Sequence, residues 1–182
     1  MPISQHRRAR ARFCNKTTGG EFLHIVLIEP EIPGNTGNIA RLCAVSGIDL
    51  HLVKPLGFSV EDKYLKRAGL DYWRLVKMHY HENFAEVLQL FEGKKFHYCS
   101  KKAPRSYNTV SYTADDLLVF GKETAGIPEN LLKEHWDDCI RIPMREGARS
   151  LNLSSAAAIV AYEAMRQIGF PGLEPSGHWH ES

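Results

Sequence analysis

Short runs of apolar residues alternate along the chain with segments whose apolar residues recur at helical spacing. Runs of consecutive apolar residues are typical of strands that are buried on both faces of a parallel sheet. They predict strands at residues 23–29, 48–53, 72–78, 95–100, 116–121 and 139–144. Strands and helices that alternate in this way favour a single α/β domain, with a mostly parallel sheet and helices on both of its faces.

The segments between the strands carry helix signals, namely capping residues, apolar residues three and four positions apart, and a terminal glycine. The first helix has Asn35 or Thr36 as its cap and ends at Gly47. Further helices are predicted at residues 59–69, 83–93, 128–135 and 154–168. The last of these is so rich in alanine that it has almost no solvent face, so we expect burial nearly all round.

Three polar loops that contain glycine follow predicted strands. They are "EPEIPGNTGN" (29–38), "GKETAGIP" (121–128) and "REGARSLN" (145–152). Loops that follow the strands of a parallel sheet emerge at the same edge, which is where open α/β sheets bind ligands. The sequence therefore predicts one ligand site that is built from all three loops.

The loops lack the glycine motifs of the common nucleotide-phosphate sites and the G-x-S-x-G motif of serine hydrolases. Their functional groups are a carboxylate, an arginine on the adjoining helix, and amides and hydroxyls: Glu123, Arg41, Asn35, Ser150 and Asn152. This set is suited to binding and positioning two substrates rather than to covalent or metal-assisted catalysis. The pairs His79/His81 and His178/His180 have no accompanying ligand cluster, so we interpret them as surface residues and predict no metal.

Composition is that of a soluble globular protein, with 43% hydrophobic and 24% charged residues. No apolar run approaches the roughly 20 residues of a membrane span, so no membrane association is expected. The cysteines lie without paired spacing, which favours free thiols in a reducing cytoplasm over a disulfide framework; they are Cys14, Cys43, Cys99 and Cys139.

The net charge of +2 is unevenly distributed. Residues 1–20 contain five basic side chains and no acid, so the remainder of the chain is slightly acidic. We expect residues 1–22 to be a disordered basic extension, with an RNA-contacting arm or a targeting peptide as alternatives. The folded domain is expected to span residues 23–173, followed by a tail at 174–182.

Three ordered motifs resemble those of the SPOUT-class RNA 2′-O-methyltransferases, and most closely the TrmL (YibK) group. They are "EPEIPGNTGNIARLCA", "FGKETAGIP" and "IRIPMREGARSLNLSSAAAIVAYEAMRQIGFPG". The resemblance covers about residues 23–173. It implies a SPOUT fold with a C-terminal trefoil knot, in which the chain's C-terminal part passes through a loop. It further implies methylation of the wobble-position ribose in a tRNA anticodon loop, on cytidine or a modified uridine, by S-adenosylmethionine.

The resemblance also implies roles for individual residues. Arg41, Asn35, Ser150 and Asn152 match catalytic positions of the family. The positions expected to bind the cofactor are Cys99, Gly121, Glu123, Ile142, Met144, Ser150 and Leu151. Arg41 is expected to position the ribose or stabilise charge, because a guanidinium with a pKa above about 12 is a poor base. Ala125 departs from the basic or polar residue that is frequent at its position in relatives.

Local clusters of basic residues are expected to contact RNA. One cluster lies in the second predicted helix and the other follows the fourth predicted strand: Lys63, Lys66, Arg67, Lys101, Lys102 and Arg105. Tyr72 and Trp73 are suited to stacking on unpaired bases, or equally to packing in a strand. Apolar residues on more than one face of the helix at 154–168 predict a homodimer.

Two other functions stay open from the sequence. One is methylation of a different RNA site, including ribosomal RNA, although relatives of that kind usually carry an extra RNA-binding domain. The other is a non-catalytic knot domain that binds adenosylmethionine or RNA, but such a domain would be expected to lack Arg41 or Asn35.

Overall fold

A seven-stranded parallel sheet forms the centre of the protein, in a computed structural model that describes residues 23–59 and 75–177. The strands are β1 (His24–Ile28), β2 (Asp49–Val53), β3 (Met78–His81), β4 (Phe96–Cys99), β5 (Arg105–Ser106), β6 (Leu117–Phe120) and β7 (Cys139–Arg141). Their order across the sheet is β3-β2-β1-β6-β4-β7-β5, and neighbouring strands run parallel throughout. The carboxyl ends of all these strands therefore meet at one edge.

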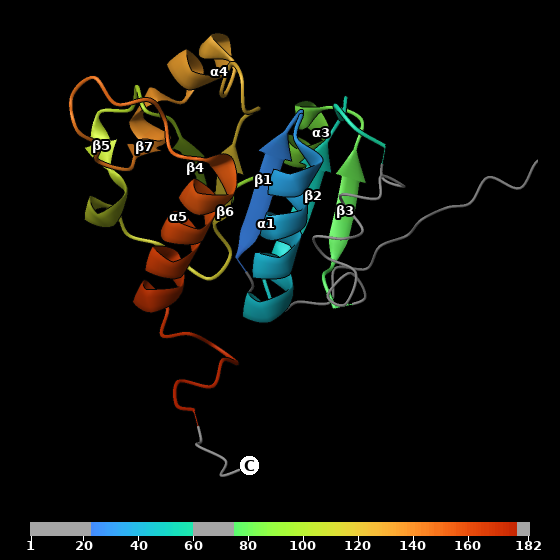
Figure 1. Cartoon of the computed structure of the whole chain (residues 1–182), viewed down its shortest axis with the longest axis vertical. Helices are drawn as coiled ribbons and strands as arrows, with labels where there is room; N and C mark the ends of the chain where they lie inside the picture. The colour runs from blue at the N-terminus through green and yellow to red at the C-terminus, as the bar shows by residue number, and fades with distance from the viewer. Residues whose placement is uncertain (1–22, 60–74, 178–182) are drawn as a thin grey trace, which may run out of the picture.

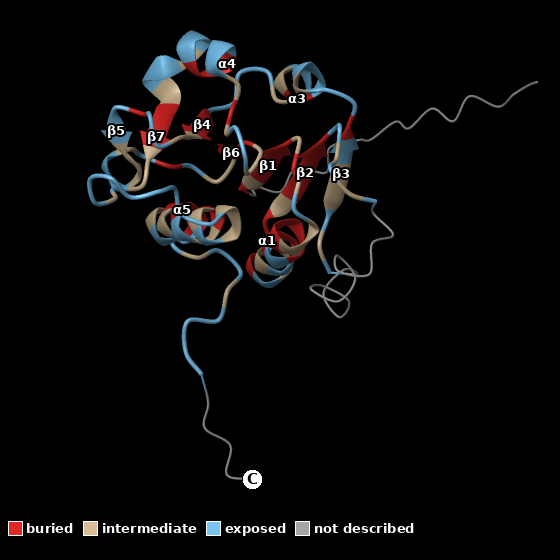
Figure 2. Cartoon of the chain, turned by 45° about the horizontal axis from the view of Figure 1, so that its top comes forward, coloured by how far each residue is buried: buried red, intermediate tan, exposed pale blue. Residues whose placement is uncertain are grey.

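Helices cover both faces of the sheet, as the sequence predicts (Figures 1 and 2). α1 (Pro33–Ser46) and α5 (Leu153–Gln167) lie side by side on one face, and α3 (Phe84–Leu90) and α4 (Glu129–Glu134) lie on the other. Two short 3-10 turns, η1 (Tyr107–Thr109) and η2 (Trp136–Asp138), complete the connections. The sheet thus forms the middle of three layers.

The core has two halves, one on each side of the sheet. Side chains alternate between the two faces along a strand. In β1, Ile25 and Leu27 pack with α1 and α5, whereas Val26 and Ile28 join the opposite cluster with Val87 of α3. Each of these side chains is at most 3% exposed. Burial on both faces explains why the strand is a continuous apolar run rather than an alternating one.

The third strand lies further along the chain than the apolar pattern predicts. The predicted strand spans 72–78, but β3 begins at Met78, and Leu75 is 67% exposed. The pairing of β3 with β2 sets its position, with Leu50 opposite Met78 and Val53 opposite His81. A search for runs of apolar residues does not detect β3, because two of its four residues are histidines. Residues 60–74, which include most of the helix predicted at 59–69, lie outside the described residues.

Helix α1 begins earlier than predicted. Its N-cap is Ile32, and Pro33 occupies the first helical position, where its fixed φ suits the helix and its missing N–H is not needed. Asn35 and Thr36 are therefore buried residues of the first turn, and the prediction that one of them is the cap is wrong. The side chain of Asn35 has tertiary partners instead, which are described with the site below.

Helix α5 has a side-chain cap and two different faces. The Asn152 side chain accepts hydrogen bonds from the backbone N–H groups of Ser154 and Ser155, at 2.9 and 3.3 Å. One face is buried in the core and consists of Ala157, Val160, Ala161, Ala164 and Met165. On another face, Ile159 and Tyr162 are 37% and 44% exposed. The chain's own core therefore covers only part of the apolar surface of α5, and the expected burial nearly all round is not reached within one chain.

The three cysteines that the structure describes agree with the expectation of free thiols. Cys43 and Cys139 are buried, Cys99 is half-buried, and all three are free thiols. Cys14 lies outside the described residues. In the part of the chain that the structure describes, no helix is both long and apolar enough to cross a membrane.

A chain of histidines lies on the α3 side of the sheet, across β1, β2 and β3. His24 Nδ1 lies 3.1 Å from His51 Nε2, and His51 Nδ1 lies 2.9 Å from His81 Nε2. The ring of His79 stacks on that of His51, and His79 Nε2 lies 3.2 Å from Asp49 Oδ2. Burial lowers the pKa of His51 to about 2 and also lowers the pKa of His24 and of His81. The buried rings are therefore neutral near pH 7.

The interpretation of His79 and His81 as surface residues is wrong for His81, which is 8% exposed. Strand alternation places both rings on the face that α3 covers, where the sequence offers no local sign of burial. Within residues 23–59 and 75–177, no group of three or more His, Cys, Asp or Glu side chains is arranged to hold a metal ion. His178 and His180 lie outside these ranges.

We expect the free energy of unfolding to fall as the pH drops below about 6.5. The pKa of His51 is 6.5 in the unfolded chain and about 2 in the fold, so between these values the unfolded chain binds one proton more. This difference destabilises the fold by about 1.4 kcal/mol per pH unit below 6.5 for His51 alone. Urea unfolding at several pH values between 5 and 8 measures it.

The matched variant is His51→Leu, which should lose part of this pH dependence. Its unfolding above pH 7.5, compared with that of the wild type, gives the cost of the substitution itself. Equal pH slopes for the two proteins would show that His51 does not carry the effect.

Candidate active site

A cavity of about 460 Å³ opens at the carboxyl edge of the sheet. We call it the carboxyl-edge cavity. Its walls come from the loop after β1, the loop after β6 and the segment between β7 and α5, which are the three loops that the sequence predicts to converge. The segment after β4, with Ser100, Lys101 and Lys102, closes a fourth side. The volume falls within the roughly 300–1,000 Å³ of typical small-molecule sites.

Nearly all the predicted site residues line this cavity. They are Asn35, Cys99, Gly121, Glu123, Ile142, Met144, Ser150, Leu151 and Asn152. The exception is Arg41, which is exposed on α1 and is not part of the cavity lining. It lies eight residues after Pro33, roughly 12 Å along the helix axis. The cavity wall and Arg41 are therefore separate features within one chain.

A hydrogen-bonded chain of three side chains joins the loops. Glu123 Oε1 accepts from Asn35 Nδ2 at 3.0 Å, and Asn35 Oδ1 accepts from Asn152 Nδ2 at 2.8 Å. Asn152 in turn caps α5 through its own oxygen. The other bonds of Glu123 are from the backbone N–H groups of Glu31 and Ile32, at 2.9 and 3.2 Å. Both carboxylate oxygens of Glu123 are thus used to hold the loop after β1.

Two further pairs tie the loop after β6 to the loop after β1. Thr124 donates to the Glu31 carboxylate from both its backbone N–H and its hydroxyl, at 3.1 and 2.7 Å, and these bonds lower the pKa of Glu31. Lys122 Nζ lies 2.6 Å from Glu29 Oε2, and this ion pair raises the pKa of Lys122. The loop after β1 and the loop after β6 therefore form one connected unit.

Gly121 is required by close packing of the backbone. A Cβ at this position would lie 2.2 Å from the Ile127 nitrogen and 2.3 Å from the Gly126 carbonyl carbon. The same turn is closed by the Gly126 N–H, which donates to Lys122 O at 2.9 Å, and Gly126 has a φ of 73° that favours glycine. The glycine pattern of this loop thus reflects a fold in which the chain lies directly on itself beside the cavity.

Cys99 contributes packing to the cavity rather than reactivity. Burial raises the pKa of its thiol to about 12, so the thiolate is scarce near pH 7. The thiol is therefore a poor nucleophile near pH 7. Ile142, Leu151 and Leu153 add apolar surface to the same lining.

Sequence reasoning missed part of the lining. Lys122 and Thr124 belong to the motif "FGKETAGIP", and their charge and hydroxyl were the available signals. Lys101 and Lys102, predicted as RNA contacts, lie on the cavity rim, where Lys102 is paired with Glu129. Ala125 also lines the cavity.

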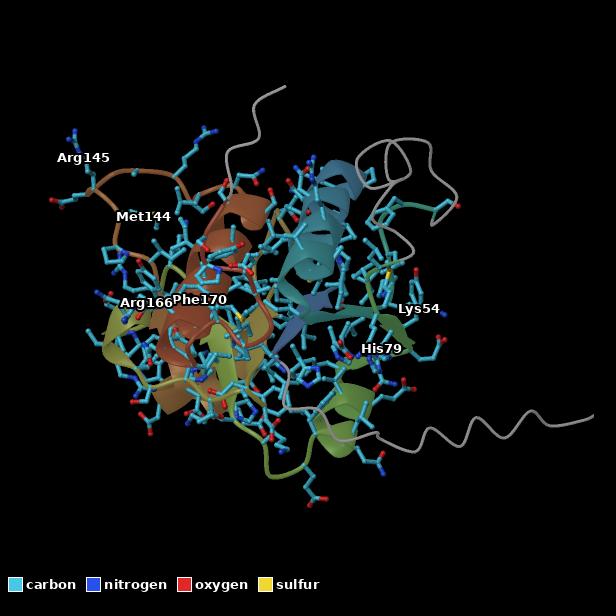
Figure 3. All side chains as sticks on the ribbon, turned by 90° about the horizontal axis from the view of Figure 1, so that it is seen from below. Lys54, His79, Met144, Arg145, Arg166 and Phe170 are labelled. Atoms are coloured by element: carbon cyan, nitrogen blue, oxygen red, sulfur yellow. The ribbon has the colours of Figure 1, made fainter. Side chains whose placement is uncertain are left out.

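Of the remaining residues expected to contact RNA, the structure describes Arg105. Arg105 is exposed on β5. The residues Lys63, Lys66, Arg67, Tyr72 and Trp73 lie outside the described residues. Figure 3 shows Met144 and Arg145 on the loop after β7, on the opposite side of the molecule from Lys54 and His79.

A parallel α/β sheet whose polar loops enclose a cavity at the carboxyl edge defines a small-molecule-binding protein of the open α/β class. The SpoU rRNA methylase family matches residues 22–162, and the chain belongs to this family. The resemblance seen in the three motifs is thereby confirmed.

Individual relatives cover nearly the same region. A tRNA (cytidine(34)-2'-O)-methyltransferase of Methylovorus glucosotrophus (strain SIP3-4) is 48% identical over 149 residues, which are 81% of this chain and 97% of the relative. A solved structure described as "Structural insights into the 2-OH methylation of C/U34 on tRNA" is 43% identical, with a TM-score of 0.77 over 81% of this chain and 97% of its own. The SpoU methyltransferase AviRb from Streptomyces viridochromogenes, in complex with the cofactor AdoMet, is 27% identical, with a TM-score of 0.73 over 81% of this chain and 58% of its own.

Proposed function

We propose that this protein methylates the ribose 2′-hydroxyl of the wobble nucleotide, cytidine or a modified uridine, in the tRNA anticodon loop, with S-adenosylmethionine as co-substrate. The observation that carries the proposal is the 48% identity to a tRNA (cytidine(34)-2'-O)-methyltransferase over 97% of that protein's length. The connected motif loops around a cavity of suitable size support it. The trefoil knot stays a prediction that rests on membership of the family.

The carboxyl-edge cavity fits S-adenosylmethionine in size and chemistry. Ile142 and Leu151 offer apolar surface for an adenine ring, and Gly121 lines the same cavity without a side chain. Ser150 and Asn152 place polar groups on the same lining. When bound, S-adenosylmethionine supplies an activated methyl group on its sulfonium. The chain's residues then have to hold the ribose oxygen in line with that methyl group.

Asn35 and Asn152 act in this proposal by fixing the geometry of the reaction. Their mutual hydrogen bond holds the start of α1 against the start of α5, with Glu123 behind Asn35. Arg41 would orient the ribose or its phosphate and stabilise developing charge. The loss of the 2′-hydroxyl proton is not assigned to Arg41, because a guanidinium does not deprotonate in proteins.

We propose that the active form is a homodimer that pairs through the α1 and α5 side of the sheet. Ile159, Tyr162 and Val45 are exposed apolar side chains on these two helices, at 37%, 44% and 49% exposure. α1 also carries the exposed Arg41. A two-fold pairing there would cover the apolar residues and bring Arg41 close to the partner subunit.

Exchanging Tyr162 for glutamate should convert the dimer into monomers, because a charge would be buried against a two-fold related apolar surface. The same change at Ala157 or Val160 is not a test of dimerisation, since both are fully buried in the chain's own core and a charge there would disrupt the fold. Light scattering and circular dichroism measure assembly and folding. A folded, fully active dimer of Tyr162→Glu would rule out this interface.

The substrate RNA would approach the cavity along exposed basic residues. Lys101, Arg145 and Arg149 are exposed and lie on or near the segments that border the cavity. Cations that neutralise phosphates make RNA affinity fall with rising salt.

We propose that the enzyme acts on tRNA in the cytoplasm. Residues 23–173 would form the catalytic domain, with residues 1–22 outside it.

Mass spectrometry of tRNA nucleosides tests the proposed function. A strain that lacks the protein should lose one 2′-O-methylated wobble nucleoside, and purified enzyme with S-adenosylmethionine should restore it. Loss of a 2′-O-methyl group at another RNA position would instead indicate a different substrate. No change in any RNA, together with intact cofactor binding, would indicate a non-catalytic domain.

A further inference from the structure

A second cavity lies at the carboxyl edge on the opposite side of the sheet, between α3 and α4. We call it the α3/α4 cavity. It has a volume of about 210 Å³ and shares no lining residue with the carboxyl-edge cavity. Its apolar surface consists of Ile28, Val53, Phe84, Pro128 and Leu131. Four polar residues complete it: Glu29, Lys54, Asn83 and Asn130.

The size of the α3/α4 cavity suits a single ring system. A water molecule takes roughly 30 Å³ in the liquid, so the cavity has the volume of about seven waters. It is smaller than the roughly 300–1,000 Å³ of sites that enclose a whole cofactor. The lining includes the aromatic ring of Phe84 together with aliphatic side chains. Aromatic and aliphatic surfaces of this kind receive unstacked bases of single-stranded RNA.

The polar residues offer groups that can read the edge of a base. The side-chain oxygen Oδ1 of Asn83 accepts a hydrogen bond from the backbone N–H of Glu86 at 3.1 Å. The side-chain NH₂ group of Asn83 is therefore available for a ligand. Asn130 is exposed on α4. A side-chain amide presents both a donor and an acceptor, which is the pattern needed to pair with a base edge. Lys54 forms an exposed ion pair with Glu82, and such pairs exchange readily for a phosphate.

The two cavities are connected by one ion pair. Lys122 lines the carboxyl-edge cavity, Glu29 lines the α3/α4 cavity, and their charged atoms lie 2.6 Å apart. Glu29 has a φ of 47°, a left-handed conformation that is strained for a residue with a side chain. It is the first residue after β1, and this conformation sets the direction in which the loop after β1 leaves the sheet. Ligands in the two cavities would therefore be separated by the ion pair of Lys122 and Glu29.

We propose that the α3/α4 cavity is a subsite for an unstacked base of the substrate RNA that lies close in sequence to the methylated nucleotide. The inference rests on the proposed function, since it requires an RNA strand at the carboxyl edge. The base packs against Phe84 and its edge meets Asn130 and Asn83. The subsite makes the enzyme sensitive to the sequence around its target, through a base that the reaction does not change.

The variant Asn130→Phe tests the subsite, because it places a ring where the base would lie. Asn130 is exposed and is not part of the carboxyl-edge cavity, so folding and S-adenosylmethionine affinity should be unchanged. Loss of one base–aromatic contact predicts that kcat/KM on an anticodon stem–loop falls about tenfold, mainly through KM. The control is Asn108→Phe, at an exposed asparagine of η1, which should match the wild type.

A set of stem–loops identifies the base that is bound. Each stem–loop lacks the base at one position near the methylated nucleotide. One such removal should lower the wild-type kcat/KM about tenfold and should have no further effect on Asn130→Phe. The proposal would be overturned if Asn130→Phe had the kcat/KM of the wild type. It would also be overturned if the losses in kcat/KM from the substitution and from the base removal multiplied, because the two changes would then act independently.

Binding of a fluorescent stem–loop is measured in parallel, so that the two proposals can fail separately. Binding without methyl transfer by the wild type would refute the proposed function. In that case, weaker binding by Asn130→Phe but not by Asn108→Phe would still support the subsite, and equal binding by all three proteins would refute it. A wild type that neither binds nor methylates the RNA would refute both.

Discussion

Replacing Gly121 with alanine is expected to weaken S-adenosylmethionine binding by at least about a hundredfold. The added methyl group would lie 2.2 Å from the Ile127 nitrogen and 2.3 Å from the Gly126 carbonyl carbon, so backbone rather than a flexible side chain has to move. Overpacking that shifts side chains and backbone costs typically about 1–3 kcal/mol, and contacts this short with backbone atoms place the variant at the upper end. The strained loop forms a wall of the carboxyl-edge cavity. Calorimetry and thermal unfolding measure the two consequences.

Gly34→Ala is the matched control for this prediction. A Cβ at Gly34 meets nothing within 4 Å, and Gly34 does not line the carboxyl-edge cavity. Its position in the first turn of α1 also suits alanine. This variant should bind S-adenosylmethionine like the wild type and be at least as stable. If Gly121→Ala matched Gly34→Ala in both measurements, the close packing at Gly121 would have no functional consequence.

The variant Arg41→Ala should lower the rate of methyl transfer at least about tenfold while leaving cofactor affinity nearly unchanged. Arg41 lies outside the carboxyl-edge cavity, on an exposed part of α1, so the two readouts should separate. Arg41→Lys retains the charge without the planar fork and should recover only part of the rate. The control is Arg166→Ala, another exposed helical arginine, whose partner is Glu163. Wild-type turnover in Arg41→Ala would remove this residue from the mechanism.

Mixed dimers then show which chain supplies Arg41 to each site. In the proposed dimer, an Arg41→Ala chain is combined with a chain that carries Ser150→Ala. Activity above that of either variant alone would mean that one intact site draws Arg41 from one chain and Ser150 from the other. Without such recovery, each chain would contain its own complete site.

Much of the site's location follows from local sequence signals. Apolar runs mark the strands, and the loops that follow them must share an edge if the sheet is parallel. Asn35, Gly121, Ser150 and Asn152 were predicted in this way, together with the three motifs, and all four line the carboxyl-edge cavity. Two-residue strands such as β5 fall below what periodicity can detect.

The tertiary structure alone decides which residues contact each other. The prediction that Glu123 binds the cofactor stays a prediction. What the sequence could not show is that the Glu123 carboxylate accepts a hydrogen bond from Asn35, 88 positions away in sequence. Asn35 and Asn152 are separated by 117 positions, and no local pattern predicts their hydrogen bond. Arg41 matches its motif, yet the helix that carries it starts at Pro33 and places it away from the cavity lining.

The histidines of β1, β2 and β3 show the same difference between what the sequence predicts and what the structure shows, here for residues of the core. The sequence suggests a surface position for His79 and His81, whereas strand register brings His81 together with His24 and His51 on the side of the sheet that α3 covers. Sequence by itself determined the order of the longer elements, the family and the edge at which the site lies, because these depend on periodicity and on motifs along the chain. The structure decided the partners of each side chain, because packing energy and hydrogen bonding depend on distances in space between residues that the sequence keeps far apart.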